Sequence, residues 1–169
     1  DEEYRHQVNV IVSDRALHEI YLPAFKAAVT EAGTWAIMGA YNLYKNQHNC
    51  HNEIMLNRIL KRDWGFDGVV VSDWGGCHDT EEAITNGLDM EFGSWTDGLS
   101  WGASNAYDNY YLAAPYLDML RKGEASTATL DAGAPWVSSA RSPTMRRRSK
   151  WLRRASCCSV TRAACCLST

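Results

Sequence analysis

The chain has 169 residues, of which 46% are hydrophobic, and a formal net charge of −3. This composition is typical of a globular domain with its own core. No apolar run reaches the roughly 18 residues that a membrane span requires, so we expect no transmembrane helix. The acidic opening is unlike the basic start of a signal peptide, and it indicates a segment from inside a longer protein whose cellular location the sequence leaves open.

Charge and cysteine are both concentrated in the last part of the chain. No acidic residue follows Asp131, whereas 8 of the 17 basic residues do, so the first 131 residues carry 9 basic and 20 acidic groups. Four of the six cysteines lie there as two adjacent pairs, which is a poor disulfide framework. A basic tail of this kind is one sign of nucleic-acid binding.

Hydrophobic spacing predicts alternating strands and helices. The expected elements are a strand at 6–12, a helix from 14 to about 32, a buried strand at 35–41, a loop at 42–52, a helix at 53–62, a strand at 69–72, a helix at 81–86, a strand at 87–91, a loop at 94–109 and a helix from about 107 to 121. Ser13 suits the N-cap of the first helix, Pro23 divides that helix, and Gly33 ends it. Asp79 or Thr80 can cap the helix at 81–86.

This order predicts an α/β fold with a parallel sheet and crossover helices. A complete (β/α)8 barrel of the TIM type needs about 250 residues, so the chain has room for about half of one. In such folds functional groups lie at the carboxyl ends of strands, where the sequence places Tyr41 and Asp73, and more loosely Glu91.

The most informative segment is the apolar strand that ends in Asp73 and Trp74. Asp73 fits three roles: a nucleophile, a metal ligand, or the N-cap of a following helix. Trp74 favours sugar chemistry, because an indole offers a flat partner to the apolar face of a sugar ring. Retaining glycoside hydrolysis needs two carboxyl groups about 5–5.5 Å apart, and Tyr41 is the candidate neighbour that keeps Asp73 ionised. Trp95 and Trp101 add aromatic surface in the next loop.

Several motifs in one order resemble family 3 glycoside hydrolases, the β-glucosidase and β-xylosidase group. The resemblance covers about residues 5–131. It rests on Ser-Asp-Arg-Ala-Leu-His-Glu-Ile-Tyr-Leu-Pro-Ala-Phe at 13–25, Met-Gly-Ala-Tyr-Asn at 38–42, Trp-Gly-Phe-Asp-Gly at 64–68, Val-Ser-Asp-Trp-Gly at 71–75 and Gly-Leu-Asp-Met-Glu at 87–91. It implies the C-terminal part of a barrel domain, to be completed by another chain or by segments missing here.

The resemblance also implies roles for four residues. Asp73 would be the catalytic nucleophile that forms a glycosyl-enzyme ester, and Trp74 would flank the sugar at the scissile bond. Met38 and Tyr41 match family positions in the sugar pocket. Trp74 favours the glucosidase-like branch over the branch that cleaves N-acetylglucosaminides. The implied substrate is a β-glucoside or a related oligosaccharide, with no cofactor, no metal, no nucleic acid and no membrane partner.

Other family features are absent from the chain. Family members hold the sugar with a Lys-His pair, an arginine and an aspartate, and the resemblance places these upstream of the region seen here. No Lys-His pair occurs in the sequence. The acid/base glutamate comes from a second, α/β-sandwich domain downstream. The chain would therefore hold the nucleophile half of a site, and a sugar-binding remnant without turnover is the alternative.

The tail at 132–169 does not match the family, which continues into a Gly-Ile-Val-Leu-Leu-Lys/Arg strand. Residues 154–160 can be back-translated so that a two-base shift reads Gly-Ile-Val-Leu-Leu-Arg. Our hypothesis is that this tail is a frame-shifted translation, which would explain its missing acids, arginine clusters and paired cysteines together. An intact frame in the coding DNA across Asp131 would contradict it, and a salt-sensitive affinity for DNA would favour the nucleic-acid tail instead.

A set of histidines and cysteines raises the question of a metal site. The residues are His48, Cys50, His51, Cys77 and His78. Their spacings match no standard zinc pattern, so the sequence favours separate loop residues over a metal centre.

Overall fold

The computed structural model of the chain describes residues 3–93 and 110–126. Five strands form two small sheets: β1 (Asn9–Val10), β3 (Leu43–Tyr44) and β4 (Gln47–His48) in one, and β2 (Ala36–Gly39) and β5 (Val69–Ser72) in the other. The helical segments are α1 (Asp14–Ala16), the π-helix η1 (Leu17–Tyr21), α2 (Pro23–Thr30), the 3-10 helix η2 (Asn49–His51), the π-helix η3 (Ile54–Asp63), α3 (Thr80–Thr85) and α4 (Ala114–Lys122).

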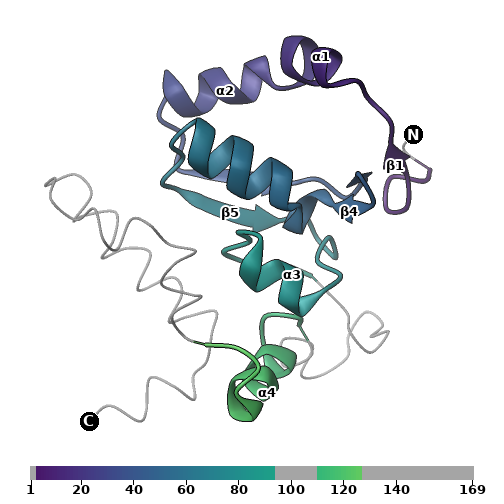
Figure 1. The fold of residues 1–169 in the computed structure, drawn as a ribbon, viewed down its shortest axis with the longest axis vertical. Coiled ribbons are helices and arrows are strands. Elements are labelled where there is room, and N and C mark those ends of the chain that lie inside the picture. Colours follow the sequence, from purple (N-terminus) through teal and green to yellow (C-terminus); the bar gives the residue numbers. More distant parts are fainter. Residues whose placement is uncertain (1–2, 94–109, 127–169) are drawn as a thin grey trace, which may run out of the picture.

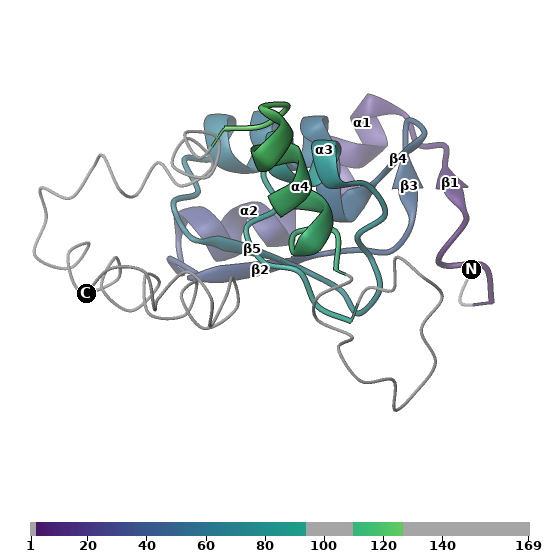
Figure 2. The ribbon, with the colours of Figure 1, turned by 90° about the horizontal axis from the view of Figure 1, so that it is seen from below.

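The β2–β5 sheet is parallel and organises the rest of the fold. Its strands pair from Ala36 opposite Val69 to Gly39 opposite Ser72. In Figure 2 the helices α2, α3 and α4 lie on one side of this pair. The β1–β3–β4 sheet stands apart at the end of the molecule where the N-terminus lies (Figures 1 and 2). The structure therefore confirms a mixed α/β fold in which helices connect parallel strands.

The first long helical segment is divided where the sequence predicts. The Ser13 hydroxyl accepts a hydrogen bond from the backbone N–H of Ala16 at 3.2 Å and caps α1. Pro23 occupies the first turn of α2, because a proline has no N–H to donate there. Gly33, at φ +62°, follows the helix in the left-handed region that glycine tolerates best.

Several predicted elements are wrong in extent or kind. Residues 42–52, expected to be a loop, contain the β3–β4 hairpin and η2; the hairpin turns at Lys45 and Asn46, both at positive φ. The predicted strand at 6–12 is paired only at Asn9 and Val10. The strand at 35–41 was expected to be buried, yet Ala36 and Met38 are exposed. The strand at 87–91 is reduced to a single parallel bridge between Val71 and Met90.

The main core lies where β5, η3 and α3 meet. Its buried members come from all three elements and the turns between them: Leu56, Leu60, Phe66, Val70, Cys77, Ala83 and Leu88. A second cluster joins η1 to the hairpin and η3 through Leu17, Tyr44 and Ile59. Burial of these apolar side chains holds β5 in place from one side. Each Å² of apolar area removed from water contributes about 25 cal/mol to the free energy of folding.

An ion pair between Lys61 and Asp89 stabilises the edge of β5 that does not pair with β2. The Lys61 Nζ lies 3.1 Å from the Asp89 carboxylate, and both side chains are largely buried. The same carboxylate accepts a hydrogen bond from the backbone N–H of Val70 at 2.8 Å. Burial raises the pKa of Asp89, while Lys61 opposes that rise. The pair therefore ties η3, β5 and the segment after α3 into one unit.

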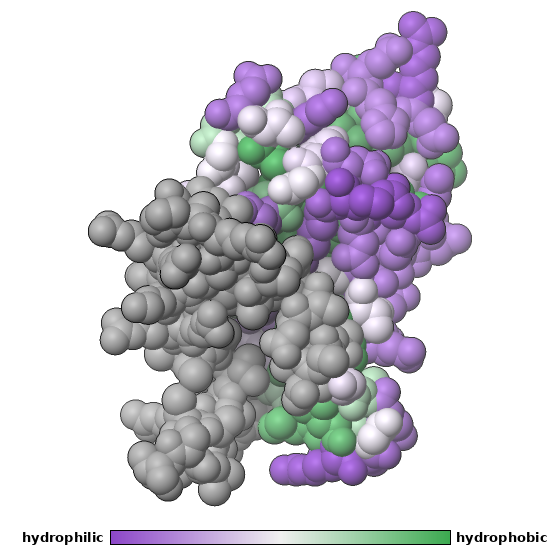
Figure 3. Space-filling model, turned by 60° about the vertical axis from the view of Figure 1, so that its left-hand side comes forward, coloured by the Kyte–Doolittle hydropathy of each residue, from purple (hydrophilic) through white to green (hydrophobic). Residues whose placement is uncertain are grey.

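Hydrophobic side chains are also exposed outside the core. They include Ile20, Tyr21, Phe25, Trp35, Met38 and Trp74, each more than half exposed. Figure 3 shows a face that is hydrophilic over much of the described part of the chain, with a hydrophobic patch near its lower end, where α4 lies in Figure 1. Within the described residues, no helix combines the length and hydropathy needed to cross a membrane.

The expected loop at 94–109, with Trp95 and Trp101, and the expected tail at 132–169 lie outside the described residues. The last helix starts later than predicted. α4 begins at Ala114 with Pro115 in its first turn, and it ends at Gly123 in the left-handed conformation, as the sequence indicates.

Candidate active site

The carboxyl ends of β2 and β5 meet at one edge because the strands are parallel and Gly39 pairs with Ser72. Asp73 follows β5 directly, and Tyr41 lies two residues beyond the end of β2. A cavity of about 570 Å³ opens at this edge. It is lined by Arg5, Phe25, Ala28, Thr34, Ala36, Ile37, Met38, Ala40, Tyr41, Asn42 and Asp73. Three of the four residues predicted for the site, Met38, Tyr41 and Asp73, therefore share one cavity.

Asp73 is half-buried at the start of a turn rather than at the start of a helix. One carboxylate oxygen accepts a hydrogen bond from the backbone N–H of Trp74 at 2.7 Å. The Asp73 carbonyl accepts another from the N–H of Gly76 at 2.9 Å. The N-cap of α3 is Asp79. The helix-cap role that the sequence left open for Asp73 is thus wrong, and its carboxylate lines the cavity.

Tyr41 acts on Asp73 directly. Burial raises the pKa of the Tyr41 phenol, and so does the neighbouring Asp73 carboxylate. A phenol that stays protonated can donate a hydrogen bond to a neighbouring carboxylate. Such a hydrogen bond stabilises the ionised form of a carboxyl group.

Arg5 is a cavity residue that sequence reasoning missed. Its guanidinium lies 5.5 Å from the centre of the Tyr41 ring, and the ring of His6 lies 4.0 Å from the same ring. Arg5 reaches this position because β1 runs parallel to β3, so the segment before β1 passes beside Tyr41. The only signal in the sequence was a basic residue just before a short strand of alternating hydrophobicity. That signal is too weak to assign Arg5 to the cavity.

Trp74 lies beside the cavity. Its indole is 61% exposed and stacks on Phe92 with ring centres 5.0 Å apart and planes 12° apart. Gly93, at φ +64°, lies so close to the indole that a Cβ there would clash with it. Among the described residues, the cavity lining does not include Trp74. The exposed face of a held indole is nevertheless available to a ligand that extends out of the cavity.

Glu91, which the sequence places less closely than Tyr41 and Asp73 at the carboxyl end of a strand, has a structural role. Its carboxylate accepts hydrogen bonds from the backbone N–H groups of Tyr111 at 3.0 Å and Leu112 at 2.7 Å, and the residue is only 9% exposed. The N–H of Gly93 also donates to the Tyr110 hydroxyl at 3.0 Å. These contacts join residues 91–93 to residues 110–112.

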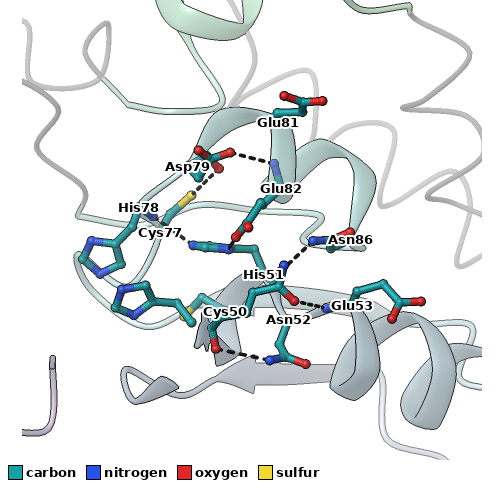
Figure 4. Close-up of polar contacts among 12 residues, drawn as sticks. Cys50, His51, Asn52, Glu53, Cys77, His78, Asp79, Glu81, Glu82 and Asn86 are labelled. Atoms are coloured by element: carbon teal, nitrogen blue, oxygen red, sulfur yellow. Dashed lines mark hydrogen bonds and ion pairs between the residues drawn. The ribbon is translucent and has the colours of Figure 1, made fainter. Parts of the chain in front are cut away.

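The histidines and cysteines that the sequence leaves as separate loop residues lie together (Figure 4). His51 is 2% exposed; its Nδ1 lies 2.7 Å from a Glu82 oxygen, and its Nε2 accepts the backbone N–H of His78 at 3.2 Å. The His78 ring stacks on His48 with ring centres 3.9 Å apart. Within the described part of the chain, no group of three or more His, Cys, Asp or Glu side chains is arranged to hold a metal ion.

Charge in this cluster is disfavoured by burial. Burial lowers the pKa of His51, although the nearby Glu82 carboxylate opposes the effect. Burial and the neighbouring histidines lower the pKa of His78 to about 4. Both rings are therefore neutral near pH 7, and the contacts of His51 join η2 to the turn that begins α3.

Comparison with known proteins gives the class of protein. Residues 3–92 match the model of the glycosyl hydrolase family 3 N-terminal domain. The chain belongs to this family, as its motifs predict.

Three similar proteins are named as β-glucosidases. A β-glucosidase from Bacteroides ovatus is 52% identical over 123 residues, which are 73% of this chain and 16% of that protein. The structure superposes on a Streptomyces venezuelae β-glucosidase solved with D-glucose, with a TM-score of 0.67 and 32% identity over 79% of this chain and 17% of the other. For β-glucosidase 3B of Thermotoga neapolitana the TM-score is 0.64, with 28% identity over 86% of this chain and 22% of the other. The chain thus spans about a fifth or less of the length of these relatives.

Proposed function

We propose that the chain supplies the nucleophile half of a retaining β-glucosidase-type active site. The observation that carries this proposal is that Asp73, at the carboxyl end of β5, lines a cavity together with Tyr41, whose pKa the Asp73 carboxylate raises. The names of the relatives point to the same chemistry.

In this mechanism Asp73 attacks the anomeric carbon of the bound sugar. The glycosidic bond breaks as a carboxylate oxygen forms an ester to the sugar, and water later hydrolyses that ester. Tyr41 keeps the carboxylate ionised before attack. The backbone N–H of Trp74 donates a hydrogen bond to one Asp73 carboxylate oxygen at 2.7 Å, which limits the orientations that the carboxylate can take.

The cavity also offers groups that fit sugar hydroxyls. Arg5 brings guanidinium donors, and Met38 brings an apolar wall; both line the cavity with Asp73. The exposed indole of Trp74 suits stacking against the sugar on the leaving-group side of the bond. We assign these three residues to substrate binding, with a β-glucoside as the substrate.

A second carboxyl group is needed to protonate the leaving group. Among the described cavity residues, Asp73 is the only carboxylate, and we propose that the acid/base residue comes from a part of the protein outside this chain. We propose further that residues 1–131 form the C-terminal part of a (β/α)8 barrel, which other segments complete, and that 132–169 are read out of frame.

A labelling experiment tests the role of Asp73 without requiring turnover. An activated 2-deoxy-2-fluoro-β-glucoside with a good leaving group is incubated with the chain, and the product is measured by intact and peptide mass spectrometry. We expect one fluoroglucosyl group on Asp73, and none in Asp73→Asn. Asp63→Asn is the matched control, because Asp63 is an exposed carboxylate paired with Arg62 outside the cavity lining. Labelling of another residue, or of none, would contradict the proposal.

The alternative is a remnant that binds sugar without turning it over, and the single carboxylate in the described cavity lining favours this for the isolated chain. Assays with aryl β-glucosides separate the two. Without an acid/base residue, activity on poor leaving groups is expected to fall by roughly 10²–10⁴-fold. Labelling of Asp73 without turnover identifies the remnant, and turnover that Asp73→Asn abolishes identifies an enzyme.

A further inference from the structure

The last rung of the β2–β5 ladder, next to Asp73, has an unusual arrangement. Val69 donates its N–H to the carbonyl of Trp35 at 2.9 Å, which sets the phase of the parallel ladder. Hydrogen bonds in a parallel pair are evenly spaced. The same phase, continued past Gly39 opposite Ser72, would bring the Asp73 N–H to the Gly39 carbonyl.

The thiol of Cys50 occupies that position instead. Its Sγ donates to the carbonyls of Gly39 at 3.3 Å and Ala40 at 3.4 Å. Cys50 is fully buried, and burial raises the pKa of its thiol to about 11, so the proton needed for donation stays in place. The backbone N–H of Asp73 lies near the sulfur, since a Cβ on Gly76 would lie 2.5 Å from the Cys50 Sγ and 3.5 Å from the Asp73 nitrogen.

Two glycines make room for this side chain. A Cβ on Gly76 would lie 2.5 Å from the Cys50 sulfur, and a Cβ on Gly39 would lie 2.6 Å from the Cys50 Cα. The sulfur is therefore enclosed by the end of β2 on one side and by the turn from Asp73 to Gly76 on the other.

We propose that Cys50 is a positioning residue for Asp73: its thiol replaces one rung of the parallel ladder and fixes where the backbone of Asp73 leaves the sheet. The inserted sulfur separates the two strand ends at the edge where the cavity opens. The catalytic meaning of this placement rests on the proposed function of Asp73, whereas the placement itself can be tested separately.

The first test measures the Asp73 backbone in the 169-residue chain by NMR. Cys50→Ala removes the sulfur beside the Asp73 amide, and we expect the hydrogen exchange of that amide to become about tenfold faster, as for the loss of one hydrogen bond. Cys50→Ser keeps a donor and an acceptor, so we expect exchange within about threefold of the parent chain.

Cys77→Ala is the matched control. Cys77 is equally buried, but its thiol contacts the carbonyl of Asp79 at 3.8 Å instead of the strand ends. We expect both alanine variants to lower the melting temperature, with only Cys50→Ala changing exchange at Asp73. Equal exchange at Asp73 in the two alanine variants, or failure of Cys50→Ser to restore it, would overturn the inference.

The second test links position to chemistry. Where the parent chain is labelled by the fluoroglucoside, we expect Cys50→Ala to slow labelling roughly 10- to 10²-fold, because small misplacements of a reacting group are costly. Cys50→Ser recovers most of the rate, and Cys77→Ala keeps it. If the parent chain is not labelled at all, the proposed function fails, and exchange at Asp73 still decides the role of Cys50.

Discussion

At the scale of single residues, the neighbours of Asp73 differ in how far sequence predicts them. Its place at a strand end follows from an apolar run that stops at a carboxylate, and Tyr41 follows from a parallel partner strand. Arg5 and Cys50 could not be placed this way. Their contacts depend on how β1 pairs with β3 and how η2 packs against β2, and no periodic pattern encodes that packing.

The histidine cluster predicts a stability change with pH. The pKa of His78 is lowered to about 4, and that of His51 is also lowered. Below the ordinary histidine value of about 6.5, the unfolded chain therefore binds more protons than the folded one. Stability is fully present above that value and falls as pH drops towards 4.

Thermal unfolding followed between about pH 7 and about pH 4.5 measures this change. We expect the melting temperature to fall across that range, and the fall to be smaller in His78→Gln, which removes one of the two titrating rings. An unchanged slope in His78→Gln would show that His78 does not contribute.

At the scale of elements, the sequence predicts those whose determinants are local. β5 has its predicted bounds, and Pro23 and Gly33 divide and end the first helical segment as expected. The β3–β4 hairpin was missed because Lys45 and Asn46 form its turn without a glycine. The strand at 87–91 is shortened because the Asp89 side chain, rather than a backbone group, binds the Val70 N–H.

The N-cap of α3 provides a prediction about an element. The Asp79 side chain accepts the backbone N–H of Glu82 at 2.8 Å and stands at the positive end of the helix. We expect Asp79→Ala to lower the free energy of unfolding by about 1 kcal/mol, measured by urea denaturation. Asp79→Ser, which keeps an acceptor, should retain most of the stability; equal losses in both variants would contradict a capping role.

At the scale of the whole molecule, several large hydrophobic side chains of the described residues lie exposed outside the core. The helices cover one side of the β2–β5 sheet (Figure 2), while Ile20 and Tyr21 on η1 are 71% and 59% exposed. Both residues belong to the predicted helix from 14 to about 32. Hydrophobic spacing indicates the helix, but it does not show whether the surface against which the helix packs belongs to the same chain.

Exposure of this kind predicts self-association of the isolated chain. We expect sedimentation velocity to show a mass that increases with concentration, and Ile20→Lys with Tyr21→Lys to shift it towards the monomer. Lys26→Glu is the control, because it changes charge at a nearby exposed position without removing apolar surface. A monomeric parent chain at all concentrations would contradict the prediction.

The hydrogen bonds of the Glu91 carboxylate have a consequence for insertions and deletions between Gly93 and Tyr110. By accepting hydrogen bonds from the amides of Tyr111 and Leu112, the carboxylate joins the residues that follow β5 to those that precede α4. The entropy of closing a loop changes slowly with its length, by about 0.6 kcal/mol for each doubling. A change in the number of residues between the two joined points would therefore cost little and would leave β5 and Asp73 in place.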